Sequence, residues 1–142
     1  MTSPGDKRWA ARTQFAMIHF KDRIFLMGGL CTNSTTQKSQ LANDIWSTQT
    51  LYDGISMWSA SSPPRATWSP RQGHQGVTHT VDGTDYMYIA GGQGVGKTFL
   101  NDVWRWSGEG VTGSWHEMTT SASWPARWAF GYAVVLSRNH LR

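Results

Sequence analysis

A short stretch in the second half of the chain, GGQGVGKT, has residue types that could hold a phosphate group. The pattern G-x-x-x-x-G-K-[ST], whose backbone amides and lysine bind nucleotide phosphates, is matched by Gly91, Gly96, Lys97 and Thr98. Such a loop needs a helix directly after it, because the helix amino terminus holds the anion. Thr98 is instead followed by FLNDVWRWSGEG, whose residue types favour a strand and a turn. We interpret the match as a false positive.

Other residues that could perform catalysis or bind metal are scattered. The histidines, His19, His74, His79, His116 and His140, lack the helical spacing of a metal site. His74 and His79 are expected on one strand, where their odd separation would place them on opposite faces. Cys31 is the single cysteine, which excludes an internal disulfide and a thiolate zinc cluster. We predict no catalytic, cofactor-binding or metal-binding residue.

Composition indicates an all-β protein. The chain has 142 residues, is 39% hydrophobic, and contains nine Trp and fifteen Gly, as expected for many strands separated by turns. It has no apolar run of roughly 20 residues that could cross a membrane and no secretory leader at its start. These observations favour an intracellular location. The net charge of +4 comes without a long basic run, so there is no clear nucleic-acid signal.

The chain repeats itself. IFLMGGLCTNSTTQKSQLANDIW and MYIAGGQGVGKTFLNDVW share an apolar strand, a Gly-Gly pair, a polar loop and Asn-Asp followed by Trp. WSPR, which ends at Arg71, recurs as WPAR and earlier as WAAR. A Phe or His stands three residues after each of these arginines. The repeat anchors are Gly28, Gly29, Asp44, Trp46, Trp58, Arg71, Gly91, Gly92, Asp102, Trp104, Trp115 and Arg127.

These anchors resemble the kelch repeat, which forms the blades of one class of β-propeller. The resemblance implies units at about 12–70 and 71–126, each a four-stranded antiparallel blade. Residues 1–11 then belong to the end of a preceding blade, and residues 127–142 begin a following one. We expect strands near 15–20, 23–27, 45–48 and 56–60, and near 75–81, 86–90, 103–106 and 114–118.

Two blades cannot close a propeller, which typically has four to eight. We therefore expect a partial propeller, completed by further blades from a longer chain or by self-association. Open blade faces are apolar patches, so the isolated chain should self-associate or aggregate.

The resemblance implies a non-catalytic protein-protein interaction module, because propellers present variable loops on a rigid scaffold. Two alternatives stay open. The chain could belong to a propeller enzyme, either an oxidase or a sugar-processing enzyme, whose site is completed by missing blades. It could also bind carbohydrate through exposed tryptophans.

Charge predicts which end of the blades binds a partner. The loops 30–42 and 93–100 should emerge on the same side as the linkers that end in the repeated arginines. This side holds Lys7, Arg8, Lys38, Arg65 and Lys97, with Asp6 in the loops and Asp44 and Asp102 at the margin. The opposite side carries Asp22, Asp53, Asp82, Asp85 and Glu109, offset by Lys21 and Arg23. We predict that an acidic protein partner docks on the basic side.

Overall fold

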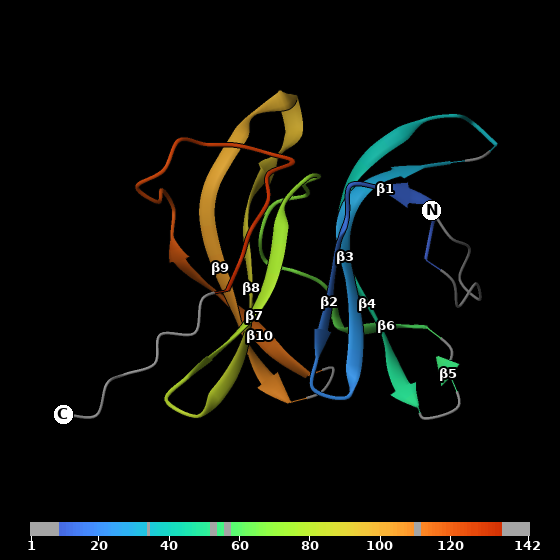
Figure 1. The fold of residues 1–142 in the computed structure, drawn as a ribbon. Helices are drawn as coiled ribbons and strands as arrows, with labels where there is room; N and C mark the ends of the chain where they lie inside the picture. Colours follow the sequence, from blue (N-terminus) through green and yellow to red (C-terminus); the bar gives the residue numbers. More distant parts are fainter. Residues whose placement is uncertain (1–8, 34, 52–53, 56–57, 110–111, 135–142) are drawn as a thin grey trace.

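The computed structural model describes residues 9–33, 35–51, 54–55, 58–109 and 112–134. Over these residues it contains two four-stranded antiparallel sheets and no closed barrel, so the all-β prediction is confirmed. Each sheet is blade-like, as expected for a piece of a propeller (Figure 1).

The strands of each sheet follow one another in chain order. The first sheet consists of β2 (Ala16–Phe20), β3 (Arg23–Thr32), β4 (Ser39–Leu51) and β6 (Ser59–Arg65). The second consists of β7 (Gln75–Val81), β8 (Thr84–Gln93), β9 (Phe99–Glu109) and β10 (Thr112–Thr119), with the 3-10 turn η1 (Val95–Lys97) before β9. Two short strands flank the first sheet: β1 (Arg12–Thr13) pairs with β3, and β5 (Gly54–Ile55) pairs with β4. One parallel pair, Thr112 with Ser62, joins β10 to β6.

Several strands are longer than the sequence predicted. The Gly-Gly pairs lie inside β3 and β8, where the register shifts between Met27 and Gly29 and between Ala90 and Gly92. Gly29 has a φ of 94° and Gly92 a φ of 106°, so the chain bends at each pair and then resumes pairing. Residues 30–42 are therefore mostly strand, and only the segment between Thr32 and Ser39 separates β3 from β4.

Two other local predictions need correction. The last strand of the first sheet was expected at 56–60 but is β6, Ser59–Arg65, which pairs with β4 around Trp46 and Asp44. His74 precedes β7, so it does not share a strand with His79. His74 is buried and His79 is exposed. The predicted strand at 75–81 coincides with β7.

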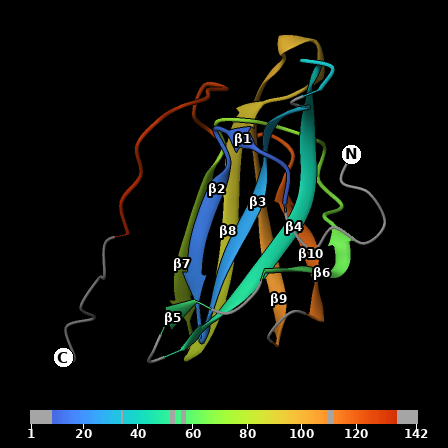
Figure 2. The same cartoon turned by 90° about the vertical axis from the view of Figure 1, so that its right-hand side faces the viewer.

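The core lies between the two sheets. Along β2, Ala16, Ile18 and Phe20 are buried and alternate with exposed residues, so one face of the first sheet points inward. This face packs against one face of the second sheet, whose strands run in the same general direction (Figure 2). The core residues are Ile18, Phe20, Phe25, Met27, Ile45, Ala66, Trp68, Met87, Ile89, Trp106 and Trp115, with Trp104 packed against them.

We expect Trp106→Ala to lower the free energy of unfolding by about 3–5 kcal/mol, because the mutation leaves a cavity in the core. The side chain of Trp106 is only 1% exposed. Urea denaturation followed by circular dichroism measures the change. Trp128→Ala is the matched control, since Trp128 is 37% exposed, and its effect should stay below about 1 kcal/mol. Equal losses in the two variants would contradict the described core.

Candidate interaction surface

Arg71 connects the linker between the sheets to the second sheet. Its Nη1 donates to Asp102 Oδ1 at 2.6 Å and to the Gly91 carbonyl at 3.0 Å, and its Nη2 donates to Asp102 Oδ2 at 2.7 Å. The Trp104 indole donates to the same carboxylate at 2.8 Å. Arg71 is 1% exposed, so this bidentate ion pair is shielded from water, and its two parallel hydrogen bonds define its geometry tightly.

The first sheet repeats this arrangement with Arg12. The Arg12 guanidinium donates to both oxygens of Asp44, at 2.6 and 2.8 Å, and to the Gly28 carbonyl at 2.9 Å. The Trp46 indole completes the set with a bond of 2.8 Å to Asp44. We call the segments 9–12, 68–71 and 124–127 straps. We call each glycine carbonyl with its aspartate carboxylate a socket.

The backbone of the middle strap binds the first sheet. Gly29 N donates to the Arg71 carbonyl at 2.8 Å, and Arg71 N donates to the Ala42 carbonyl at 3.1 Å. The Asn43 amide donates to the carbonyls of Ala66 and Trp68, which fixes the linker before the strap. Because the main chain of Arg71 binds one sheet and its side chain binds the other, this residue sets how the two sheets lie relative to each other.

The sequence repeat includes Arg71, Asp44 and Asp102 among its anchors and Arg12 at the end of WAAR, but it did not predict which of these residues pair. The signal was present: Arg12 and Arg71 are 59 residues apart, and Asp44 and Asp102 are 58 apart. Burial alone would raise the pKa of both aspartates, but hydrogen bonds from the arginines and tryptophans outweigh it and hold each pKa below its usual value. The aspartates are therefore ionised partners of the straps.

The β3–β4 and β8–β9 hairpin tips and the straps lie at one end of the sheets, which we call the loop end. Figure 1 shows the β3–β4 and β8–β9 tips at the top, away from the β2–β3 and β7–β8 turns. Lys38 and Lys97 are exposed at these two tips. Lys7 and Arg8 lie outside the described residues, and Arg65 pairs through its backbone with Asp44. The described part of the predicted basic face therefore consists of Lys38 and Lys97, beside the neutralised strap pairs.

The opposite end carries exposed acidic residues. Asp22, Asp82 and Asp85 are exposed in or beside the β2–β3 and β7–β8 turns. Asp85 accepts a hydrogen bond from Thr80 at 2.6 Å, and Asp22 accepts one from Gln49 at 3.4 Å. Asp53 lies outside the described residues, and Glu109 is the last residue of β9.

The phosphate-loop match falls on the β8–β9 hairpin. Gly91 lies within β8, Gly96 and Lys97 lie in the three-residue turn η1, and β9 begins at Phe99. The prediction of a strand after Thr98 is confirmed. A strand places no helix amino terminus beside Lys97, so this hairpin lacks the feature that holds phosphate in such loops.

A groove of about 520 Å³ lies beside the socket of the first sheet. Its walls include Arg12, Asp44 and Trp46 on one side and Cys31 and Lys38 toward the hairpin tip. Burial raises the pKa of the Cys31 thiol, an effect that exceeds the opposing influence of Arg12. The thiol is therefore poorly suited to act as a nucleophile.

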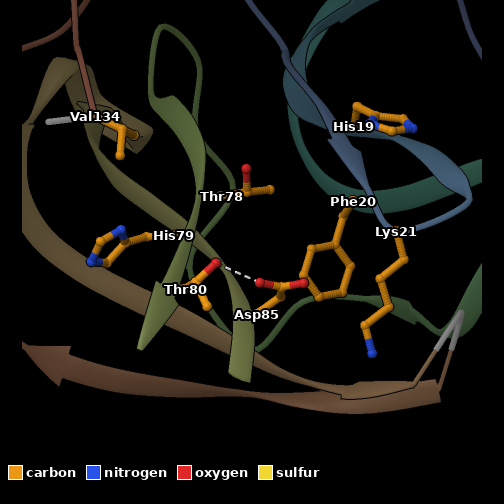
Figure 3. A pocket seen from close by; sticks show the side chains of 8 residues that line it. All are labelled: His19, Phe20, Lys21, Thr78, His79, Thr80, Asp85 and Val134. Atoms are coloured by element: carbon orange, nitrogen blue, oxygen red, sulfur yellow. Dashed lines mark hydrogen bonds between the residues drawn. The ribbon is translucent and has the colours of Figure 1, made fainter. Parts of the chain in front are cut away.

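A smaller pocket of about 250 Å³ lies between β2 and β7. In Figure 3 the imidazoles of His19 and His79 lie on different sides of this pocket and do not converge. Within the described residues, no group of three His, Cys, Asp or Glu side chains could hold a metal ion.

Comparisons with known proteins give no family assignment. No protein-family model matches the chain, and no curated protein matches it. Over the described ranges, no helix has the length and apolar character needed to span a membrane.

His74 is buried behind the middle strap. Its ring packs on Trp68 at 5.5 Å between centroids, in the position that Phe15 occupies beside Trp9 in the first repeat. Within the described part of the chain, neither ring nitrogen has a hydrogen-bond partner. Burial, with the nearby Arg71 charge, lowers the pKa of His74 to about 3, so the ring is neutral at neutral pH.

We expect His74 to destabilise the fold as the pH falls below its ordinary pKa of 6.5. The unfolded chain then binds a proton that the folded chain does not. Stability should fall by about 1.4 kcal/mol per pH unit until the pH nears the folded pKa. His74→Phe should flatten this slope between pH 6 and 5, measured by urea denaturation at each pH. Exposed His79 supplies the control variant, His79→Gln, which should keep the wild-type slope; an unchanged slope in His74→Phe would refute the assignment.

We expect Asp102→Ala to lower the free energy of unfolding by about 3–5 kcal/mol, because it leaves the buried Arg71 charge unpaired. Thermal or urea melts measure the loss. Asp82→Ala removes an exposed carboxylate and should change stability by less than about 0.5 kcal/mol. A small effect at Asp102 would show that the ion pair does not hold the sheets together.

Proposed function

We propose that this chain is part of a kelch-type propeller and acts as a non-catalytic protein-interaction module whose loop end binds an acidic partner. The kelch assignment is supported by the placement of the repeat. In both sheets the Gly-Gly pair sits at a bulge of the second strand, and the Asp-x-Trp element binds the strap arginine from the third strand. The repeated residues thus perform the same structural role in each unit.

One observation carries the partner chemistry. At the loop end, Arg12 and Arg71 are neutralised by Asp44 and Asp102, whereas Lys38 and Lys97 at the hairpin tips and Arg127 on the third strap are exposed positive charges. The turns at the opposite end expose carboxylates. The fold therefore separates positive from negative charge along its length, and an acidic segment would be attracted to the loop end.

The loop end also suits binding mechanically. Lys38 and Lys97 sit at the tips of hairpins whose bases are tied to the straps, so the two tips are presented by a common framework. A partner that contacts both tips finds them already in position, which lowers the entropic cost of binding.

The test uses a fluorescently labelled polyglutamate peptide as the acidic probe. Reversing Lys38→Glu and Lys97→Glu together should weaken binding by about tenfold or more and flatten its salt dependence. Fluorescence anisotropy at several salt concentrations measures both effects.

Lys21→Glu with Arg23→Glu is the matched control, because it changes the net charge equally but at the opposite end. This control should weaken binding much less than the loop-end pair. If the two double variants behave alike, net charge alone drives binding and the loop end is not the site. Tight binding of neutral glycans, unaffected by the loop-end pair, would favour the carbohydrate-binding alternative instead.

A further inference from the structure

The described residues contain three straps but only two sockets. The third strap, 124–127, is held on the second sheet just as the middle strap is held on the first. Gly92 N donates to the Arg127 carbonyl at 2.9 Å, and Arg127 N donates to the Leu100 carbonyl at 3.1 Å. The Arg127 Nε donates to the carbonyl two residues earlier, Pro125, at 3.0 Å, as Arg71 Nε does to Ser69 at 3.1 Å.

The guanidinium of Arg127 nevertheless faces solvent. Arg127 is exposed, and no carboxylate in the described part of the chain pairs with it. The tryptophan of its strap, Trp124, is 37% exposed, whereas the equivalent Trp68 is fully buried. Trp128 is also 37% exposed and stacks on Phe99, itself 48% exposed. The third strap is therefore set in its binding conformation and carries uncovered aromatic surface.

The sheet face beside this strap is also less covered than its counterpart. Phe25 lies three residues before Gly28 and is 1% exposed, because the second sheet packs on it. Tyr88 lies three residues before Gly91 and is only half-buried. The outer face of the second sheet thus corresponds to a surface that, in the first sheet, is an interface.

The complementary half is at the other end of the same chain. The first socket is filled by Arg12, whose side chain is only 1% exposed, but its Asp44 side chain is 28% exposed, against 12% for Asp102 in the second socket. The 520 Å³ groove runs beside Asp44 and Trp46. Trp46 itself is 9% exposed, and the corresponding residue of the second sheet, Trp104, is partly buried and packs against the core between the sheets.

We propose that the third strap of one copy of this chain docks in the first socket of a second copy. Arg127 takes the place of Arg12 and donates to Asp44 and to the Gly28 carbonyl. The two straps share the sequence pattern W-x-A-R, as WPAR and WAAR. Because the backbone of Arg127 is bound to the second sheet of its own copy, docking brings that sheet against the partner copy. Docking therefore also covers Trp124 and fills the groove beside Asp44 of the partner copy.

This contact is head-to-tail, since the strap and the socket are different surfaces of one chain. Repeating it joins further copies in the same direction, and the assembly closes into a ring if the rotation per copy allows. The proposal concerns self-association and does not depend on the acidic partner proposed above.

The first experiment measures self-association of the full chain by sedimentation velocity up to about 100 µM. The wild type should associate with increasing concentration, and Arg127→Ala should weaken association by about 30-fold or more. Lys21→Ala removes an exposed positive charge from the opposite end and should leave association unchanged. A monomeric wild type, or equal association of Arg127→Ala, would overturn the proposal.

The second experiment tests direction. Asp44→Asn keeps the third strap but weakens the socket, and Arg12→Ala with Arg127→Ala keeps an open socket without that strap. Each variant alone should be monomeric, and their mixture should form a one-to-one complex. Absence of the complex between folded variants argues against head-to-tail docking. If Asp44→Asn does not fold, a synthetic peptide of residues 119–131 should dissociate wild-type assemblies, and failure to do so counts against the proposal.

Discussion

The ion pair between Arg71 and Asp102 is the interaction on which the arrangement of the two sheets depends. The guanidinium reaches the carboxylate of β9 and the Gly91 carbonyl of β8, while the main chain of the same residue binds Gly29 and Ala42 of the first sheet. A planar, two-pronged cation fixes direction as well as distance. The core between the sheets supplies most of the buried apolar surface, but apolar packing alone does not fix the orientation of one sheet relative to the other. The hydrogen bonds of the middle strap fix that orientation.

The same interaction shapes the surface. An aspartate that pairs with a strap arginine no longer contributes negative charge to the loop end, so that end is basic even though Asp44 and Asp102 stand near it in the sequence. Lys38 and Lys97 remain exposed at the tips. The difference in charge between the two ends of the sheets is thus a consequence of the ion pairs that hold the straps.

The two repeats are equivalent in framework and different in detail. Phe15 and His74 occupy matching places beside Trp9 and Trp68, but only His74 introduces a titratable ring into buried surroundings. Cys31 and Lys38 border a groove beside the first socket, whereas in the second socket the Asp102 side chain is only 12% exposed. Such differences set which surfaces of a repeat protein remain available.

The sequence alone determined the all-β class, the two repeats and the strand that follows Thr98. These features could be predicted because Gly-Gly, Asn-Asp-x-Trp and apolar periodicity are local signals. Strand ends could not, since pairing continues through the bulges at Gly28–Gly29 and Gly91–Gly92 only when a neighbouring strand is in place. The pairing of Arg71 with Asp102, 31 residues away, and the burial of His74 were decided by the tertiary structure. Whether a charged residue forms an ion pair or stays exposed on the surface depends on which residues the fold places beside it.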